Sequence, residues 1–137
     1  MTIIQDFNAS VPSNFSESLS RAIPASPSSI TLANFGLAVN ATGSNVLLIG
    51  TVGIQSFLGV PDVSLKIFRN TTLIGTIQVN TLAVSEVRNT TFQIVDSNPP
   101  IGYYAYTLTA EVVNPLLNQA TATGPISFSG TSLAPGF

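Results

Sequence analysis

The side chains that could carry out chemistry are few, and the sequence does not group them. The 137 residues include no Cys and no His, which removes the thiolate nucleophile and the commonest general base and metal ligand. A Ser–His–Asp triad and a zinc site of Cys and His are therefore excluded. Six acidic residues remain for a catalytic carboxylate pair, but such acids are usually solvated on the surface. We expect a protein that is not an enzyme and that uses no metal and no cofactor.

Two small groups of polar residues are the strongest local candidates for a site. Asp96, Ser97 and Asn98 could supply oxygen ligands to calcium, although the same residues are equally typical of a turn. Lys66 could form an isopeptide crosslink with a buried acid, and Glu111 is the first partner to inspect. A lysine more commonly keeps its charged end in solvent, so both interpretations of Lys66 stay open.

The charge content bears on the kind of partner. Charged residues make up 7% of the chain, against about 25% in an average globular protein, and the net charge is −2. Nucleic-acid binding, which needs clustered Lys and Arg, is therefore not expected. So few charges defend a surface weakly against self-association, which favours a self-assembling protein. A soluble surface of uncharged Ser, Thr and Asn is the alternative.

No segment of the sequence resembles a signal for export or a membrane anchor. The first ten residues, MTIIQDFNAS, lack a basic region followed by a long apolar run. Nowhere does the chain reach the roughly 18 consecutive apolar residues of a membrane helix. We expect a protein made in a cytoplasm, without membrane insertion, that reaches any surface without standard secretion.

The elements that must carry these side chains are strands. Residues 102–114 alternate with a period of two, which indicates a strand with one face on a core. We expect this to be a central antiparallel strand, with Tyr103 opposite the apolar face formed by Tyr104, Tyr106, Leu108, Ala110 and Val112.

A second segment, residues 45–57, is apolar on both of its faces. A strand of this kind is usually covered on both sides, and in so small a chain the second cover could be another subunit. Residues 63–70 and 72–80 indicate a hairpin. Seven to nine short strands and no convincing helix predict an all-β fold, an antiparallel β-sandwich with jelly-roll or Greek-key topology over residues 30–137.

The segment before this domain, residues 1–29, is rich in Ser, Asn, Ala and Pro, which indicates a flexible or extended N-terminal connector. It nevertheless carries apolar residues, among them Ile3, Ile4 and Phe7. We expect these three to dock either onto the sandwich of the same chain or onto a neighbouring subunit by strand addition.

Several stretches resemble small exosporium proteins of spore-forming bacilli, chiefly the group called exosporium protein C, and the jelly-roll subunits of endospore appendages. They are VLLIGTVGIQ (residues 46–55), VSLKIFRNTTLIGT (63–76), the 96–100 turn, AYTLTAE (105–111) and GPISFSG (124–130). The likeness covers about residues 30–133, and its motifs are structural rather than catalytic.

This resemblance implies a structural subunit of the spore surface, made in the mother cell and assembled without a signal peptide. The appendage comparison implies that an N-terminal segment of one subunit inserts into the next, with other exosporium proteins as further partners. The chain lacks the cysteines that crosslink some appendage subunits. The runner-up is a trimeric binding head, tumour-necrosis-factor-like or lectin-like, with Tyr103, Tyr104 or Tyr106 at its site; a capsid decoration protein is third.

Overall fold

The computed structural model describes residues 2–80 and 83–135, and it is built from strands, with no helix among these residues. Nine strands follow one another along the chain. They are β1 (Thr2–Ser13), β2 (Arg21–Ile23), β3 (Ile30–Val39), β4 (Asn45–Leu58), β5 (Val63–Arg69), β6 (Thr72–Val79), β7 (Val87–Ser97), β8 (Gly102–Val112) and β9 (Gln119–Pro135).

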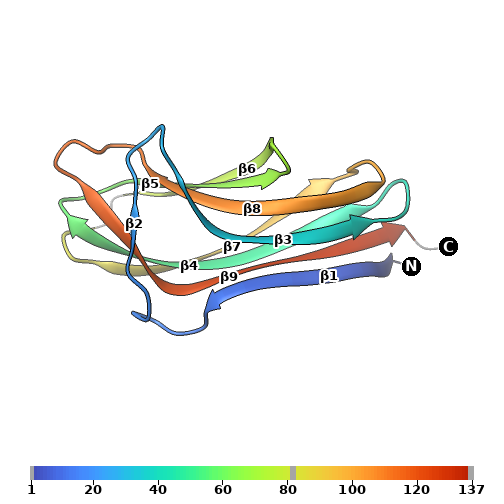
Figure 1. Ribbon diagram of the computed structural model, residues 1–137, viewed down its shortest axis with the longest axis horizontal. Coiled ribbons are helices and arrows are strands. Elements are labelled where there is room, and N and C mark those ends of the chain that lie inside the picture. The colour runs from blue at the N-terminus through green and yellow to red at the C-terminus, as the bar shows by residue number, and fades with distance from the viewer. Residues whose placement is uncertain (1, 81–82, 136–137) are drawn as a thin grey trace.

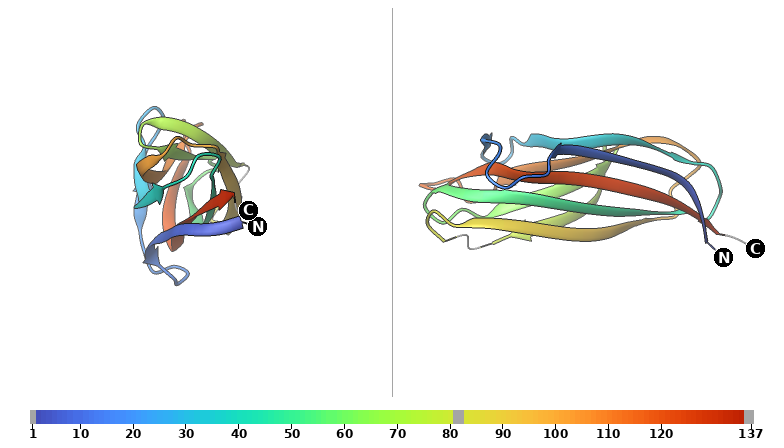
Figure 2. Two further views of the ribbon diagram at one scale, coloured as in Figure 1. Left: turned by 90° about the vertical axis from the view of Figure 1, so that its right-hand side faces the viewer. Right: turned by 90° about the horizontal axis from the view of Figure 1, so that it is seen from below.

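The strands form two antiparallel sheets that pack face to face (Figure 1). One sheet has the order β1-β9-β4-β7, with the short β2 added to β9, and the other has the order β3-β8-β5-β6. Figure 2 shows the two layers end-on and the elongated outline from the side. This interleaved order is that of a jelly roll, so the predicted β-sandwich is confirmed.

Strand β8 occupies the central position that the alternation of residues 102–114 predicted. It is central in its sheet, between β3 and β5, and Tyr106, Leu108 and Ala110 are fully buried. The predicted hairpin is also present, as β5 and β6 joined at Asn70. Asn70 has a φ of 53°, a left-handed turn conformation that Asn tolerates better than most residues.

Aromatic rings from both sheets meet in the core. Phe35 of β3 lies with its ring centroid 5.0 Å from that of Phe128 in β9 and 5.8 Å from that of Tyr106 in β8. Phe92 of β7 extends the cluster from the other side of Phe128. Gly130 allows this approach, because a Cβ at that position would lie 2.7 Å from the Phe35 ring. The rings therefore tie the two sheets together at their centre.

The sandwich begins earlier in the chain than residue 30. Strand β1, within the expected connector, pairs antiparallel with β9 of the same chain, from Thr2 opposite Pro135 to Ser13 opposite Ile126. It supplies the first strand of the jelly-roll order. The sequence concealed this because β1 is an edge strand with little buried surface, so its pattern alternates weakly.

Strand β4 has the two apolar faces that the sequence indicated, but this chain covers only one of them. Val46, Leu48 and Val52 are fully buried between the sheets. On the outward side Leu47 is half-buried, and Ile49 is 45% exposed. Residues 2–80 and 83–135 therefore do not supply the second cover predicted for this strand.

Truncating the ring at the centre of the core should be costly. We expect Phe128→Ala to lower the free energy of unfolding by about 3–5 kcal/mol, because it removes buried apolar area and leaves a cavity between Phe35 and Phe92. Urea denaturation followed by fluorescence or circular dichroism measures this. The exposed Thr91→Ala on the same sheet should cost no more than about 1 kcal/mol, and equal losses would contradict the packing described.

Candidate functional site: an uncharged apolar sheet face

Apolar side chains gather on the outward face of the β1-β9-β4-β7 sheet. Residues paired directly across antiparallel strands point to the same side, and the register aligns Phe7, Thr131, Leu47 and Val95 in one row. Ile4 and Leu133 form the next row on one side. We call the following set the outer apolar patch: Ile4, Phe7, Leu47, Ile49, Val95 and Leu133.

The outer apolar patch is open to solvent over much of its area. Phe7 is 61% exposed, Ile4 67% and Val95 51%. Its neighbours on the same face are uncharged: Ser129 and Gln93 lie opposite Ile49, and Asn45 lies opposite Leu133. A group of exposed apolar side chains on one face of a protein commonly marks a contact surface.

Within residues 2–80 and 83–135, no charged side chain belongs to this face. The charged residues on its four strands are Asp6, Arg88 and Asp96. Each is paired across the sheet with a fully buried residue, respectively Ser132, Ile54 and Val46, and so lies on the inward side. A partner for the patch therefore needs no complementary charge, and another copy of the same uncharged face satisfies this condition.

Polar side chains on the inward side of β1 hold it against β3 of the other sheet. The Ala38 amide donates to Asp6 Oδ2 at 2.9 Å, and Asn8 Nδ2 donates to the Gly36 carbonyl at 2.9 Å. Gln5 Oε1 accepts from the Asn40 amide at 2.6 Å. These bonds close one side of the sandwich and fix which side chains of β1 face outward.

The three predicted docking residues divide between two faces. Ile4 and Phe7 lie in the outer apolar patch, whereas Ile3 pairs with the buried Ala134 on the inward side and is 50% exposed at the sheet edge. All three belong to a strand that is paired within its own chain, which is one of the two arrangements expected for them. Their docking onto a neighbour stays a prediction.

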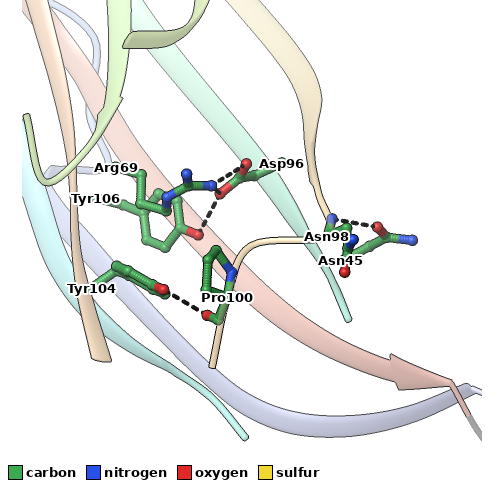
Figure 3. Close-up of polar contacts among 7 residues, drawn as sticks. All are labelled: Asn45, Arg69, Asp96, Asn98, Pro100, Tyr104 and Tyr106. Carbon is green, nitrogen blue, oxygen red and sulfur yellow. Dashed lines mark hydrogen bonds and ion pairs between the residues drawn. The ribbon is translucent and has the colours of Figure 1, made fainter. Parts of the chain in front are cut away.

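A buried polar cluster, which we call the clasp, connects the two sheets near one end (Figure 3). Arg69 Nη1 of β5 donates to both carboxylate oxygens of Asp96 in β7 at 2.8 Å, and the Tyr106 hydroxyl donates to Asp96 Oδ2 at 2.8 Å. The bond to Asp96 raises the pKa of Arg69. Burial, reinforced by the bond to Asp96, raises the pKa of the Tyr106 phenol, which therefore stays protonated as a donor.

The contacts in the clasp determine whether Asp96 is available to bind calcium at residues 96–98. Asp96 is 6% exposed and turns its carboxylate inward to Arg69 and Tyr106. A guanidinium at this distance repels a cation. Asn98 is used in the turn, where its amide donates to Asn45 Oδ1 and its φ is 52°. The turn interpretation accounts for these contacts, and no group of three or more acidic residues suited to a metal occurs in residues 2–80 and 83–135.

Lys66 and Glu111 are brought together, as suggested by sequence. Lys66 Nζ lies 2.6 Å from Glu111 Oε1 across β5 and β8, and Glu111 is almost wholly buried. Hydrogen bonds from Lys66 and Ser26 lower the pKa of Glu111. The observed contact is an ion pair between side chains of neighbouring strands. An isopeptide bond between Lys66 and Glu111 stays a prediction.

The three tyrosines proposed for a binding head do not form one cluster. Tyr106 is fully buried, and Tyr104 is half-buried with its hydroxyl donating to the Pro100 carbonyl at 2.6 Å (Figure 3). Tyr103 is 71% exposed, but it points from the opposite face of β8 and lies over Gly36. Of the three candidates, only Tyr103 is exposed enough to contact a ligand, and the binding-head alternative stays a prediction.

Part of the outer apolar patch could not be predicted from the sequence. The sequence indicates a second apolar face on residues 45–57, to which Leu47 and Ile49 belong, but nothing in it indicates that Phe7 and Leu133 join this face. Pairing of β9 with β1 and β4, which lie far from it in the sequence, supplies that connection. The only sign of the patch in the sequence is that β1 and β4 each carry two apolar residues at successive outward positions, Ile4 and Phe7 in β1 and Leu47 and Ile49 in β4.

No protein-family model and no curated protein matches this sequence. Solved structures match its fold. The chain is similar to the infectious bursal virus derived T=1 particles, with a TM-score of 0.59 at 16% identity over 92% of this chain and 31% of the viral one. The T13 IBDV viral particle gives 0.56 at 14% identity, over 92% and 30%. Dimeric latent PorU from Porphyromonas gingivalis gives 0.53 at 11% identity, over 93% and 12%.

The described chain spans less than a third of the length of the viral chains it matches. At such low identity the likeness concerns the fold alone, and it agrees with the jelly-roll strand order. The part of the chain that the structure describes contains no helix long and apolar enough to cross a membrane.

Removing the acid of the clasp should destabilise the domain. We expect Asp96→Asn to lower the free energy of unfolding by about 2–4 kcal/mol, because it leaves Arg69 partly buried without its counter-charge. Tyr106→Phe should cost about 1 kcal/mol for one hydrogen bond. Urea denaturation measures both, with the exposed Glu17→Gln as the charge-removal control. An Asp96→Asn variant as stable as the wild type would contradict the clasp.

The ion pair of Glu111 should give the stability a pH dependence of known sign. Because the folded-state pKa is lowered, the pair stabilises the protein above the unfolded pKa of about 4.3 and loses this effect as pH falls through the folded pKa. We expect Glu111→Gln to cost about 1–2 kcal/mol at pH 7. The difference from wild type should shrink below about pH 4. Thermal or urea unfolding from pH 7 to pH 3 tests this, and a constant difference would contradict it.

Proposed function

We propose that this domain is a structural subunit that assembles with copies of itself, without covalent links, on the surface of a bacterial spore. The single observation that supports self-assembly most strongly is the outer apolar patch, whose apolar side chains are exposed on one sheet face that carries no charged side chain among the described residues. Burying such a face against another sheet is a common way to build a β-protein assembly, because two sheet faces pack with interdigitated side chains.

The composition supports the same proposal. Only ten residues of the chain are charged, four basic and six acidic, and five of them are engaged in the clasp, the Lys66 pair or the bond from Asp6 to β3. Little electrostatic repulsion is left to keep copies apart. The absence of Cys means that contacts between copies rest on packing and hydrogen bonds.

The likeness to viral particles is compatible with a structural role, since the matched proteins are described as particles. That assembly belongs to those proteins. For this chain, placement in the exosporium or in an appendage fibre is proposed from the sequence resemblance, together with synthesis in the mother-cell cytoplasm without a signal peptide and contact with other exosporium proteins.

The part that β1 plays in assembly has two forms. In the described chain, β1 stays on its own β9 and contributes Ile4 and Phe7 to the patch. In the exchanged form, β1 of one subunit would occupy the same place on a neighbour, as in a domain swap. The pairs with β9 and the bonds from Asp6 and Asn8 to β3 would be lost in one chain and remade in the other. The exchange therefore changes the free energy little at equilibrium, but it requires the segment after β1 to span the distance from one subunit to the next.

Substitutions in the patch test the proposal. Phe7→Ser and Ile49→Ser should each raise the protein concentration needed for assembly about tenfold, because each removes roughly 1.4 kcal/mol or more of apolar burial per contact. Size-exclusion chromatography with light scattering and negative-stain microscopy of the untagged protein measure this. Thr91→Ser, which lies on the same sheet outside the patch, serves as the matched control.

The wild type should form regular higher assemblies, and both patch variants should remain folded by circular dichroism. A wild-type protein that stays monomeric at high concentration would overturn the proposal. Assembly that is unchanged by both patch variants would show that another surface carries it.

A further inference from the structure

A second exposed apolar surface lies at the end of the sandwich opposite the Thr2–Pro135 pair. It is formed by the loops that follow β4 and β8 (Figure 1). Leu116 is 83% exposed and Leu117 78%, the highest values among the large apolar residues that the structure describes. We call this set the apolar tip: Phe57, Leu58, Val60, Val113, Leu116 and Leu117. Neither loop, residues 57–60 or 113–118, contains a charged residue.

Asparagine side chains hold the two loops of the apolar tip together. The Val60 amide donates to Asn118 Oδ1 at 2.8 Å, and the Asp62 amide donates to Asn114 Oδ1 at 2.7 Å. Asn118 Nδ2 also donates to the Asn114 carbonyl at 2.8 Å. The exposed leucines therefore project from a cross-braced base rather than from an unsupported loop.

The backbone at Leu117 is in an unfavourable conformation for its residue type. Its φ of 61° lies in the left-handed region, where a Cβ is crowded and where Gly or Asn is far easier to accommodate. A leucine in this conformation, with its side chain in solvent, gains nothing for the stability of its own chain. Strain of this kind points to a role for the side chain outside the fold.

A pocket lies directly beside these leucines. It has a volume of about 500 Å³, and its apolar lining comes from β2, the end of β4 and the same loop after β8. The lining residues that matter here are Ala22, Ile23, Ala25, Phe57, Val112 and Pro115. Because Pro115 and Asn118 both line it, the loop that carries Leu116 and Leu117 also forms one wall of the pocket.

We propose that the apolar tip is a docking surface for a second copy of this chain, in which Leu116 and Leu117 of each copy enter the pocket of the other. The pocket is lined mostly by apolar residues, and Ser20, Asn118, Gln119 and Thr121 form the polar part of its lining. An apolar projection and a mostly apolar hollow on one surface are self-complementary under two-fold rotation, since each contact then occurs twice. A volume of about 500 Å³ accommodates two leucine side chains. A lipid surface would cover the leucines but leave the pocket unfilled, and the tip offers no basic residue to anionic headgroups.

This inference rests on the proposed self-assembly and adds a contact distinct from the outer apolar patch. A subunit with two different two-fold contacts on separate surfaces links to one neighbour through each. Successive copies then form an open chain unless the two axes close it. The tip contact would thus turn face-to-face pairs into longer assemblies.

Variants at the two surfaces separate the two ideas. Sedimentation velocity should show that Leu116→Ser together with Leu117→Ser stops growth at a pair, with a dissociation constant for the tip contact raised at least tenfold. Phe7→Ser should instead weaken the patch contact about tenfold, so that tip-linked pairs are the main species at concentrations at which the wild type forms longer assemblies. If the tip variant assembles like the wild type while Phe7→Ser does not, the tip inference is overturned and the proposed function stands. A monomeric wild type overturns both.

Cysteine pairing tests the geometry, because the natural chain contains no cysteine that would interfere. Leu116→Cys and Ala22→Cys variants, mixed as separate chains under mild oxidation, should form the mixed disulfide dimer at least tenfold faster than Leu116→Cys mixed with Thr91→Cys. Equal rates would contradict entry of the leucine into the pocket.

Relieving the strain gives a readout that a structural role would not produce. Leu117→Gly should shift the urea midpoint upward, because glycine suits the left-handed conformation, while it weakens the tip contact at least tenfold. Loss of stability together with unchanged association would overturn the inference. Co-flotation of the wild type with phosphatidylcholine vesicles, lost in the Leu116→Ser and Leu117→Ser variant, would also overturn it in favour of a membrane.

Discussion

Strand β9 holds the larger sheet together, because β1, β2 and β4 all pair with it. β9 has 17 residues. Along one edge, its C-terminal part pairs with β1 and its N-terminal part pairs with β2, and along the other edge it pairs with β4. The period of two in every one of these strands then decides which side chains face the core and which face solvent. A shift of one residue in any of these pairings would exchange the two faces, so the outer apolar patch and the buried core depend on the same register.

The inward and outward faces of the β1-β9-β4-β7 sheet have different roles. The inward face packs Phe128 and Phe92 against Phe35 of the other sheet. The outward face carries an apolar surface of similar character that a single chain leaves uncovered. The charged side chains on the described strands of this sheet lie on its inward face, where Asp96 is paired with Arg69 at one end of the sandwich. In the other sheet, Glu111 is paired with Lys66. The few charges of this chain thus connect strands within the fold and leave one broad face free of charge.

Much of the fold could be predicted from sequence, because local alternation reports on burial. Strand β8, the hairpin of β5 and β6, and the two apolar faces of β4 follow from neighbouring residues alone. The strand order, the place of β1 on β9 and the meeting of Arg69 with Asp96 do not, since they join residues far apart in the chain. Lys66 and Glu111 were paired by chemical type, and the adjacent β5 and β8 brought them together. The strain at Leu117 is a backbone property that its residue type conceals.

The central claim is that the outward face of the β1-β9-β4-β7 sheet is buried between copies. Hydroxyl-radical footprinting measures this directly, since Phe7 in the outer apolar patch and Tyr103 on the opposite sheet are both exposed in the single chain. Their oxidation rates would be compared below and above the concentration at which the protein assembles. The account predicts that Phe7 becomes strongly protected while Tyr103 keeps its rate. Phe7 equally reactive in both states, or protection of Tyr103 alone, would contradict it.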